Sequence, residues 1–229
     1  MDLTFSGIGA AYYPQLGSNC AFFVHSNHLF LIDCGESTFR KMAERKEIYT
    51  YEHITVLITH LHMDHIGSLG SFLSFCKNEL KKTVQVIAED EAIVHILSMC
   101  GIPPANYEFT TDFRQCKKEG LCIIPHRATH ANGMMCCGFE ISDGVSTIYF
   151  SGDSSVLPGE VLEKFLHKDI QIMYHECTFL DKDSTSHTSL EKLKKWIPPQ
   201  ERKRVFLMHF GGNYQEIVCE AGFQVPNIV

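Results

Sequence analysis

The stretch Thr59-His60-Leu61-His62-Met63-Asp64-His65 decides how this sequence is interpreted. It follows residues 54–58, an unbroken apolar run that predicts a buried β-strand. Because residues two apart in an extended segment face the same way, His60 and His62 can bind one metal ion. A helix that starts at the Asp-His pair turns those two side chains toward a second ion. If these were solvated loop residues instead, the four ligand-type side chains would have to coincide by chance.

Three further predicted strand ends carry ligand-type side chains, in loops where functional residues are often found. Each of them, taken singly, can be explained as a capping or hydrogen-bonding residue. Together with the first stretch they complete a set of metal ligands. They are His130 after residues 121–125, Asp153 after residues 147–150, and His209 after residues 205–208.

Short β-rich runs alternate with helical patterns along the chain, which indicates a layered α/β architecture. We expect strands at residues 3–6, 21–24, 28–32, 54–58, 84–88, 121–125, 135–141, 147–150, 170–174 and 205–208. Helices are expected at residues 37–45, 69–81, 159–166, 190–196 and 214–221, and around Ile93 to Leu97 with a stop at Gly101. The sequence shows no linker and no short repeat, so a single domain over residues 1–229 is expected.

Composition limits the classes of partner. The 229 residues carry a net charge of −7, which disfavours a protein that grips long RNA or DNA. No export signal and no apolar run of membrane-spanning length are seen, so neither export nor membrane insertion is expected. The ten cysteines lack paired CxxC spacing and are expected to be reduced, buried thiols of a cytoplasmic protein.

The HxHxDH motif of residues 60–65 resembles the signature of the metallo-β-lactamase fold superfamily, and the other motifs of that family occur in the expected order. The resemblance implies a four-layer αββα sandwich with two divalent ions, Zn²⁺ or alternatively Mn²⁺. It also implies that Asp33 organises the loop from behind, although a strand-end turn residue is an equal explanation. The implied ligands are His60, His62 and His130 for the first ion, Asp64, His65 and His209 for the second, and Asp153 as the bridge.

Within this family the sequence resembles the ribonuclease Z branch of phosphodiesterases. Residues 5–11 resemble its opening strand and glycine turn, His175-Glu176-Cys177-Thr178-Phe179 resembles its HEATF motif, and His187-Thr188-Ser189 resembles its HST motif. His187 is the candidate acid that protonates the departing alkoxide, or else an N-terminal helix residue without a chemical task. Glu176 either orients His187 or has a structural role at the strand end.

Two departures argue against processing of transfer RNA. Residues 131–152 leave no room for the basic arm that ribonuclease Z inserts there, and Ser18 stands where the family usually carries Arg. The chain is similar in length and motif order to the compact anti-Pycsar family, which hydrolyses cyclic nucleotide monophosphates. That resemblance implies attack by a metal-bridging hydroxide, with Asp64 accepting a proton as well as binding metal, and a homodimer.

Other interpretations remain open on the same fold. They are transfer-RNA 3′ processing, thioester or lactone hydrolysis, antibiotic hydrolysis, a di-iron redox protein and a non-catalytic binding module. Aromatic residues at Tyr12, Tyr13 and from Phe210 to Tyr214 are expected to be packing residues, with stacking on a nucleobase as the alternative.

Overall fold

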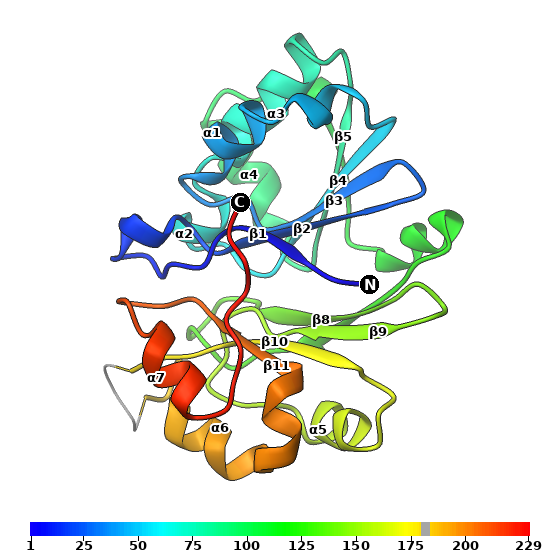
Figure 1. Ribbon diagram of the computed structural model, residues 1–229. Coiled ribbons are helices and arrows are strands. Elements are labelled where there is room, and N and C mark those ends of the chain that lie inside the picture. Colours follow the sequence, from blue (N-terminus) through cyan, green and yellow to red (C-terminus); the bar gives the residue numbers. More distant parts are fainter. Residues whose placement is uncertain (180–183) are drawn as a thin grey trace. The chain divides into compact units, whose positions relative to one another are not determined.

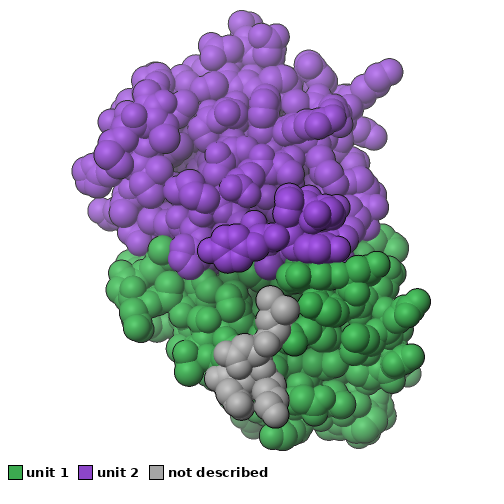
Figure 2. Space-filling model, turned by 90° about the vertical axis from the view of Figure 1, so that its left-hand side faces the viewer, with its two compact units in different colours: residues 1–2, 114–227 green, residues 3–113, 228–229 purple. Residues whose placement is uncertain are grey.

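The computed structural model describes residues 1–179 and 184–229. The chain divides into two compact units, which Figure 2 shows in different colours. The N-terminal unit, purple in Figure 2, comprises residues 3–113 and 228–229, and the C-terminal unit, green, comprises residues 1–2 and 114–227. The single domain expected over residues 1–229 stays a prediction.

The N-terminal unit is built on one six-stranded sheet in the order β1-β2-β3-β4-β5-β6 (Figure 1). Strands β1 to β3 pair antiparallel, and β3 to β6 pair parallel. Strand β3 is buried along its whole length and β4 in all but its first residue, as their continuous apolar runs require. The strands are β1 (Thr4–Gly7), β2 (Cys20–His25), β3 (His28–Ile32), β4 (His53–Ile58), β5 (Val84–Ala88) and β6 (Tyr107–Thr110).

Helices of the N-terminal unit are short and amphipathic. Helix α3 buries Leu69, Phe72, Leu73 and Cys76, which recur at the three- and four-residue spacing of one helix face. The helices are α1 (Thr38–Ala43), α2 (Met63–Ile66), α3 (Leu69–Asn78) and α4 (Ala92–Met99), with 3-10 turns η1 (Pro14–Leu16), η2 (Lys46–Tyr49) and η3 (Pro104–Asn106). A further 3-10 segment, η4 (Phe113–Glu119), runs from this unit into the next.

The C-terminal unit is built on a five-stranded sheet in the order β11-β10-β9-β8-β7 (Figure 1). Strands β9, β10 and β11 are parallel, so their carboxyl ends meet at one edge of the sheet. The elements are β7 (Cys122–Arg127), β8 (Cys137–Ser142), β9 (Thr147–Phe150), α5 (Gly159–Leu166), β10 (Ile172–Glu176), α6 (Leu190–Trp196), η5 (Pro199–Arg204), β11 (Val205–Met208) and α7 (Gln215–Glu220).

Most predicted elements are present, and the differences have local causes. The helix expected over residues 69–81 ends at Asn78, and Lys81 has a φ of 59°, which a helix cannot contain. Strand β6 was not predicted, because it is a short edge strand whose polar residues give no apolar run. Strand β7 extends past Pro125, which is tolerated because β7 lies at the edge of its sheet.

The prediction for the cysteines is correct in part. All ten cysteines lie in the described ranges and all are free thiols. Cys100 and Cys219 are exposed, so the expectation of ten buried thiols is wrong for these two. Both follow or end short helices on their polar side. Among the described residues, no helix has the length and apolar character to cross a membrane.

Candidate metal centre

In the N-terminal unit, the end of β4 places two histidines together. His62 is extended at the entry to α2, with φ −68° and ψ 151°, so the chain from His60 to His62 keeps the two-residue periodicity of a strand. Nε2 of His60 lies 3.1 Å from Nδ1 of His62. Two ligand atoms on a tetrahedral zinc ion lie about 3.3 Å apart when each bond is about 2.0 to 2.1 Å. The two nitrogens therefore fit a shared ion.

The first turn of α2 carries the other two residues of the motif. Asp64 and His65 are both buried, and Oδ2 of Asp64 lies 3.4 Å from Nε2 of His65. The imidazole rings of His60 and His65 have centroids 4.0 Å apart. The structure thus brings all four side chains of HxHxDH into one cluster within this unit.

Asp33 accepts hydrogen bonds from this cluster and from the residue before it, which fits the role in organising the loop that the resemblance implied. Nδ1 of His65 donates to Oδ2 of Asp33 at 2.8 Å, and the backbone N–H of Thr59 donates to Oδ1 at 2.8 Å. With Nδ1 protonated, Nε2 of His65 is the nitrogen that can bind an ion. Burial raises the pKa of the Asp33 carboxyl, and the facing His65 opposes that shift.

The turn after Asp33 also requires a glycine. A Cβ on Gly35 would overlap the backbone oxygen of Asp64, so a larger residue would push α2 away. The backbone N–H of Cys34 donates to the oxygen of His65 at 2.7 Å and ties the same two segments together. Close backbone contact therefore fixes the position of the Asp-His pair relative to Asp33.

In the C-terminal unit, Asp153 lies at the centre of the second cluster. It follows β9 after Gly152, whose φ is 57°, and its side chain is buried. Oδ2 of Asp153 lies 3.6 Å from Nε2 of His130 and 3.3 Å from Nε2 of His209. These separations are close to those of donor atoms on one ion, and a single oxygen faces a histidine on either side. Asp153 and these two histidines could therefore supply donor atoms to a metal ion.

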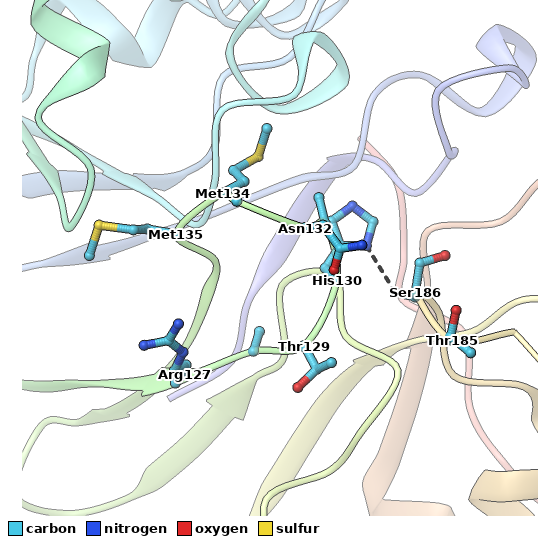
Figure 3. Close-up of a pocket in the computed structure, with 11 residues that line it drawn as sticks. Arg127, Thr129, His130, Asn132, Met134, Met135, Thr185 and Ser186 are labelled. Atoms are coloured by element: carbon cyan, nitrogen blue, oxygen red, sulfur yellow. Dashed lines mark hydrogen bonds between the residues drawn. The ribbon is translucent and has the colours of Figure 1, made fainter.

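His130 is fixed in one tautomer by a backbone group. Its Nδ1 donates to the carbonyl oxygen of Ser186 at 2.9 Å, the contact drawn as a dashed line in Figure 3. Nε2 therefore keeps its lone pair and faces Asp153. His209, with φ 60°, leaves β11 in a left-handed conformation that turns its side chain toward the same carboxylate.

The buried Glu176 and the half-buried His187 form a hydrogen-bonded pair beside this cluster. Oε1 of Glu176 accepts from Nδ1 of His187 at 3.2 Å and from the backbone N–H groups of Ser154 and Thr188, each at 3.0 Å. Complete burial raises the pKa of Glu176, and His187 opposes the shift. The ring of His187 lies 4.7 Å from that of His130 and 5.5 Å from that of His209, between centroids. His187 thus lies close to both candidate histidine ligands of its unit.

The packing expected for the aromatic residues is present from Phe210 to Tyr214 but not at Tyr12. Phe210 is buried, and Tyr214 stacks on Phe179 with ring centroids 4.1 Å apart. The other face of Tyr214 lies against Gly212, where a Cβ would come within 2.8 Å of the ring. Tyr12 is different, because 98% of its surface is exposed.

Sequence reasoning missed the groups that orient the ligands. The hydroxyl of Thr59, the carbonyl of Ser186 and the backbone N–H groups of Ser154 and Thr188 all contact candidate site residues. Three of these four groups belong to the backbone, which is the same for nearly all residue types. No sequence signal could therefore have identified those three groups. Thr59 lies directly before the histidine motif, and that adjacency was the one available signal.

Comparisons with known proteins show the family and the fold of this chain. A family model described as a beta-lactamase superfamily domain matches residues 28–210. The anti-Pycsar protein Apyc1 of Bacillus phage BSP38 is 24% identical over 243 residues, which cover 94% of this chain and 91% of that protein. Ribonuclease Z of Streptococcus sanguinis is 29% identical over 129 residues, covering 53% of this chain and 41% of that protein.

Among solved structures, the metallo-beta-lactamase fold protein YhfI from Bacillus subtilis matches with a TM-score of 0.76 at 19% identity. The match covers 99% of this chain and 95% of that one. It confirms the predicted α/β fold class with two sheets and their helices.

Proposed function

We propose that this chain, which belongs to the β-lactamase superfamily, hydrolyses small cyclic nucleotide monophosphates to linear nucleotides. The family resemblance predicted from the HxHxDH motif is confirmed, and the chain is a hydrolase of that fold. The observation that carries the choice of substrate class is the hydrogen-bonded Glu176–His187 pair, since breaking a phosphodiester of an alcohol calls for a proton donor at the departing oxygen.

The donor sets of the two units fit two divalent ions, and we assign all seven predicted ligands to them. His60, His62 and His130 are proposed for the first ion, Asp64, His65 and His209 for the second, and Asp153 for both. Zn²⁺ suits the mixture of imidazole and carboxylate donors, and Mn²⁺ is the alternative. When bound, such a pair of ions lowers the pKa of water toward 7 and neutralises charge on a phosphate.

The chain's own residues then divide the remaining work. Glu176 accepts from Nδ1 of His187 and so directs Nε2 of that ring away from itself, which leaves Nε2 to carry the proton for the ribose oxygen. Asp64 accepts a proton from the attacking water in addition to binding metal. Asp33 keeps His65 in the tautomer that leaves Nε2 available.

Transfer-RNA processing is the second candidate, and three observations make it the weaker one. Strand β7 ends at Arg127 and β8 begins at Cys137, so the connection between them is too short to hold a substrate-binding arm. The match to ribonuclease Z covers 41% of that protein, whereas the match to the anti-Pycsar protein covers 91%. A net charge of −7 also gives long RNA no general attraction.

The proposal includes a homodimer and a cytoplasmic location. The ten free thiols, eight of them buried or half-buried, suit a reducing compartment. The homodimer follows from the resemblance to the compact phosphodiesterases of the family. Size-exclusion chromatography with light scattering tests it.

A substrate screen tests the proposed function. Purified protein is incubated with 2′,3′- and 3′,5′-cyclic mononucleotides, a precursor transfer RNA and a thioester, and bound metal is measured in parallel. We expect cyclic nucleotide hydrolysis that stops when a chelator removes the metal. Cleavage of the RNA with no turnover of cyclic nucleotides would favour the second candidate, and thioester turnover alone would remove both.

A further inference from the structure

A pocket of about 790 Å³ opens in the C-terminal unit next to His130 (Figure 3). It is lined by Arg127 at the end of β7, by residues 128–135 of the connection to β8, and by Thr185 and Ser186. Its volume lies within the range of about 300 to 1,000 Å³ that is typical of small-molecule sites. The pocket therefore has room for one nucleotide.

The connection that forms the pocket is held in a defined shape. The backbone N–H of Ala128 donates to the oxygen of Cys136 at 2.8 Å, which continues the β7–β8 ladder beyond Arg127. The N–H of Thr129 donates to the hydroxyl of Ser154 at 3.2 Å, and the N–H of Ser155 donates to the oxygen of Thr129 at 2.8 Å. These bonds anchor the pocket wall to the loop that carries Asp153.

The two ends of the pocket differ in chemistry. Figure 3 shows His130 and Ser186 at one end and Arg127 with Met135 at the other. The first end contains a proposed metal ligand, whereas the second contains a guanidinium and a thioether. A ligand with a phosphate at one end and a flat ring at the other matches this polarity.

The lining favours an anionic ligand with an aromatic part. None of the described residues that line the pocket is acidic, although the chain has 27 Asp and Glu against 20 Lys and Arg. Met134 and Met135 offer thioethers, which adapt to aromatic faces, and Met135 is 48% exposed. The hydroxyls of Thr129 and Thr185 can bond a sugar.

Arg127 supplies a donor that no residue in the described part of the chain engages. Its side chain is exposed and makes no hydrogen bond or ion pair with any of the residues that the structure describes. A guanidinium donates in a planar fork and accepts nothing. Guanine presents two neighbouring acceptors, O6 and N7, to such a fork, whereas adenine presents one acceptor and one donor on the same edge.

We infer that this pocket binds the nucleobase and ribose of the substrate and that Arg127 makes it select guanine over adenine. The inference rests on the proposed function, because the phosphate is taken to lie at the His130 end. Met134 and Met135 contact the ring face. Arg127 is a specificity residue that binds the base edge.

Steady-state kinetics on 3′,5′-cyclic GMP and cyclic AMP test the inference. Wild-type protein is expected to show a KM for cyclic GMP about tenfold lower than for cyclic AMP, the effect of hydrogen bonds to a charged donor. Arg127→Ala should raise the KM for cyclic GMP to that for cyclic AMP, and Arg127→Lys, which lacks the fork, should do nearly the same. Lys195→Ala removes an exposed charge from α6 in the same unit and should change neither value.

Methyl nitrophenyl phosphate carries no nucleobase. The wild type and the Arg127→Ala, Arg127→Lys and Lys195→Ala variants should therefore hydrolyse it equally. Met135→Ala should raise the KM for both purines by up to about tenfold, the upper limit of a thioether–ring contact. Met99→Ala, which removes an exposed thioether from α4, should leave both KM values unchanged. Equal KM values for the two purines in the wild type, or an Arg127→Ala variant that affects both purines equally, would overturn the inference.

Binding measurements separate this inference from the proposed function. Isothermal titration of the metal-loaded protein with GMP and AMP reports base selection without any turnover. Arg127-dependent preference for GMP in a protein that hydrolyses no cyclic nucleotide would reject the proposed function and support the pocket. Hydrolysis of cyclic nucleotides with equal affinity for GMP and AMP would support the function and reject the pocket assignment.

Discussion

The N-terminal and C-terminal units assemble their donor sets in opposite ways. In the N-terminal unit, four donors come from one stretch between the end of β4 and the first turn of α2. In the C-terminal unit, His130, Asp153 and His209 come from three loops far apart in sequence. The first arrangement depends on local backbone conformation. The second depends on the sheet, whose parallel strands align the ends of β9 and β11 through the intervening β10.

Despite this difference, the two units use the same kind of support. Asp33 accepts from the backbone N–H of Thr59, the residue before the first ligand of its unit. Glu176 accepts from the backbone N–H of Ser154, the residue after Asp153. Each buried carboxylate also accepts from a histidine at the site. One fully buried acid in each unit thus fixes both a loop and a ring.

Removing one donor from either unit should give the largest effect. His62→Ala and Asp153→Ala should each lose bound metal and lower kcat/KM for a cyclic nucleotide by at least about 10³-fold, since metal assistance supplies several kcal/mol. Metal content by elemental analysis and hydrolysis rates check this. Asp169→Ala, an exposed acid of the C-terminal unit, is the control. Full activity with intact metal content in either variant would remove that residue from the ligand set.

The second-largest effect should come from His187 of the C-terminal unit, and the loss of rate should depend on the leaving group. His187→Ala should slow cleavage of an alkyl phosphodiester by about 10² to 10⁴ but affect a nitrophenyl phosphodiester much less, because a good leaving group needs no acid. Rates on both esters, with exposed His167→Ala as the control, measure this difference. Equal losses on the two esters would exclude His187 as the proton donor.

This contrast between the units also explains what the sequence could predict. The donors of the N-terminal unit could be assigned to one site because His60, His62, Asp64 and His65 are neighbours in sequence. Those of the C-terminal unit were identified as candidates at predicted strand ends and were assigned to particular ions through family resemblance, since nothing local links His130 to His209. The strands over residues 84–88, 147–150 and 205–208 were predicted at their observed bounds, because each is a continuous β-rich run.

Other features depended on groups that side-chain identity does not encode. The carbonyl of Ser186 selects the tautomer of His130, and any residue type at position 186 would supply one. The pocket along residues 127–135 follows from the path of a loop, and the apolar and polar pattern of that loop does not determine its path. The end of helix α3 at Asn78 was missed for a related reason, because the apolar period continues past the point where the backbone turns.

A smaller effect, on metal affinity, should distinguish the two buried acids Asp33 and Glu176. Asp33→Asn should weaken metal affinity by about 10- to 100-fold, the usual cost of losing a residue that orients a ligand. Glu176→Gln keeps an oxygen that can accept from Ser154 and Thr188, so metal affinity should stay near the wild-type value while cleavage of an alkyl ester slows. Competition with a chelator measures affinity for both variants. Unchanged affinity in Asp33→Asn would contradict the role assigned to Asp33.

The smallest predicted effect concerns acid sensitivity of the C-terminal unit. His175 in β10 is fully buried and donates from Nδ1 to the oxygen of Glu176 at 2.8 Å, and burial lowers its pKa to about 4. Because the unfolded chain takes up this proton near pH 6.5 and the folded chain does not, the free energy of unfolding should fall as pH decreases. The loss between pH 7 and pH 5 is about 2 kcal/mol from this residue.

Urea unfolding of the chelator-treated protein at the two pH values measures that loss. His175→Gln should unfold with a free energy that changes by about 2 kcal/mol less over the same interval. Comparing the two slopes cancels the contributions of the other histidines. Identical slopes for the wild type and His175→Gln would show that burial of His175 does not govern acid sensitivity.

We propose that the donors of both units bind two metal ions, and a titration of the apo-protein with metal is the decisive experiment for this proposal. Apo-protein is titrated with Zn²⁺ by calorimetry while hydrolysis of a cyclic nucleotide is followed on matched samples. We expect two ions per chain in the wild type, with activity rising as the second ion binds, and loss of bound metal in Asp153→Ala. A wild-type protein that binds no ion, or an Asp153→Ala variant that still binds two, would contradict it.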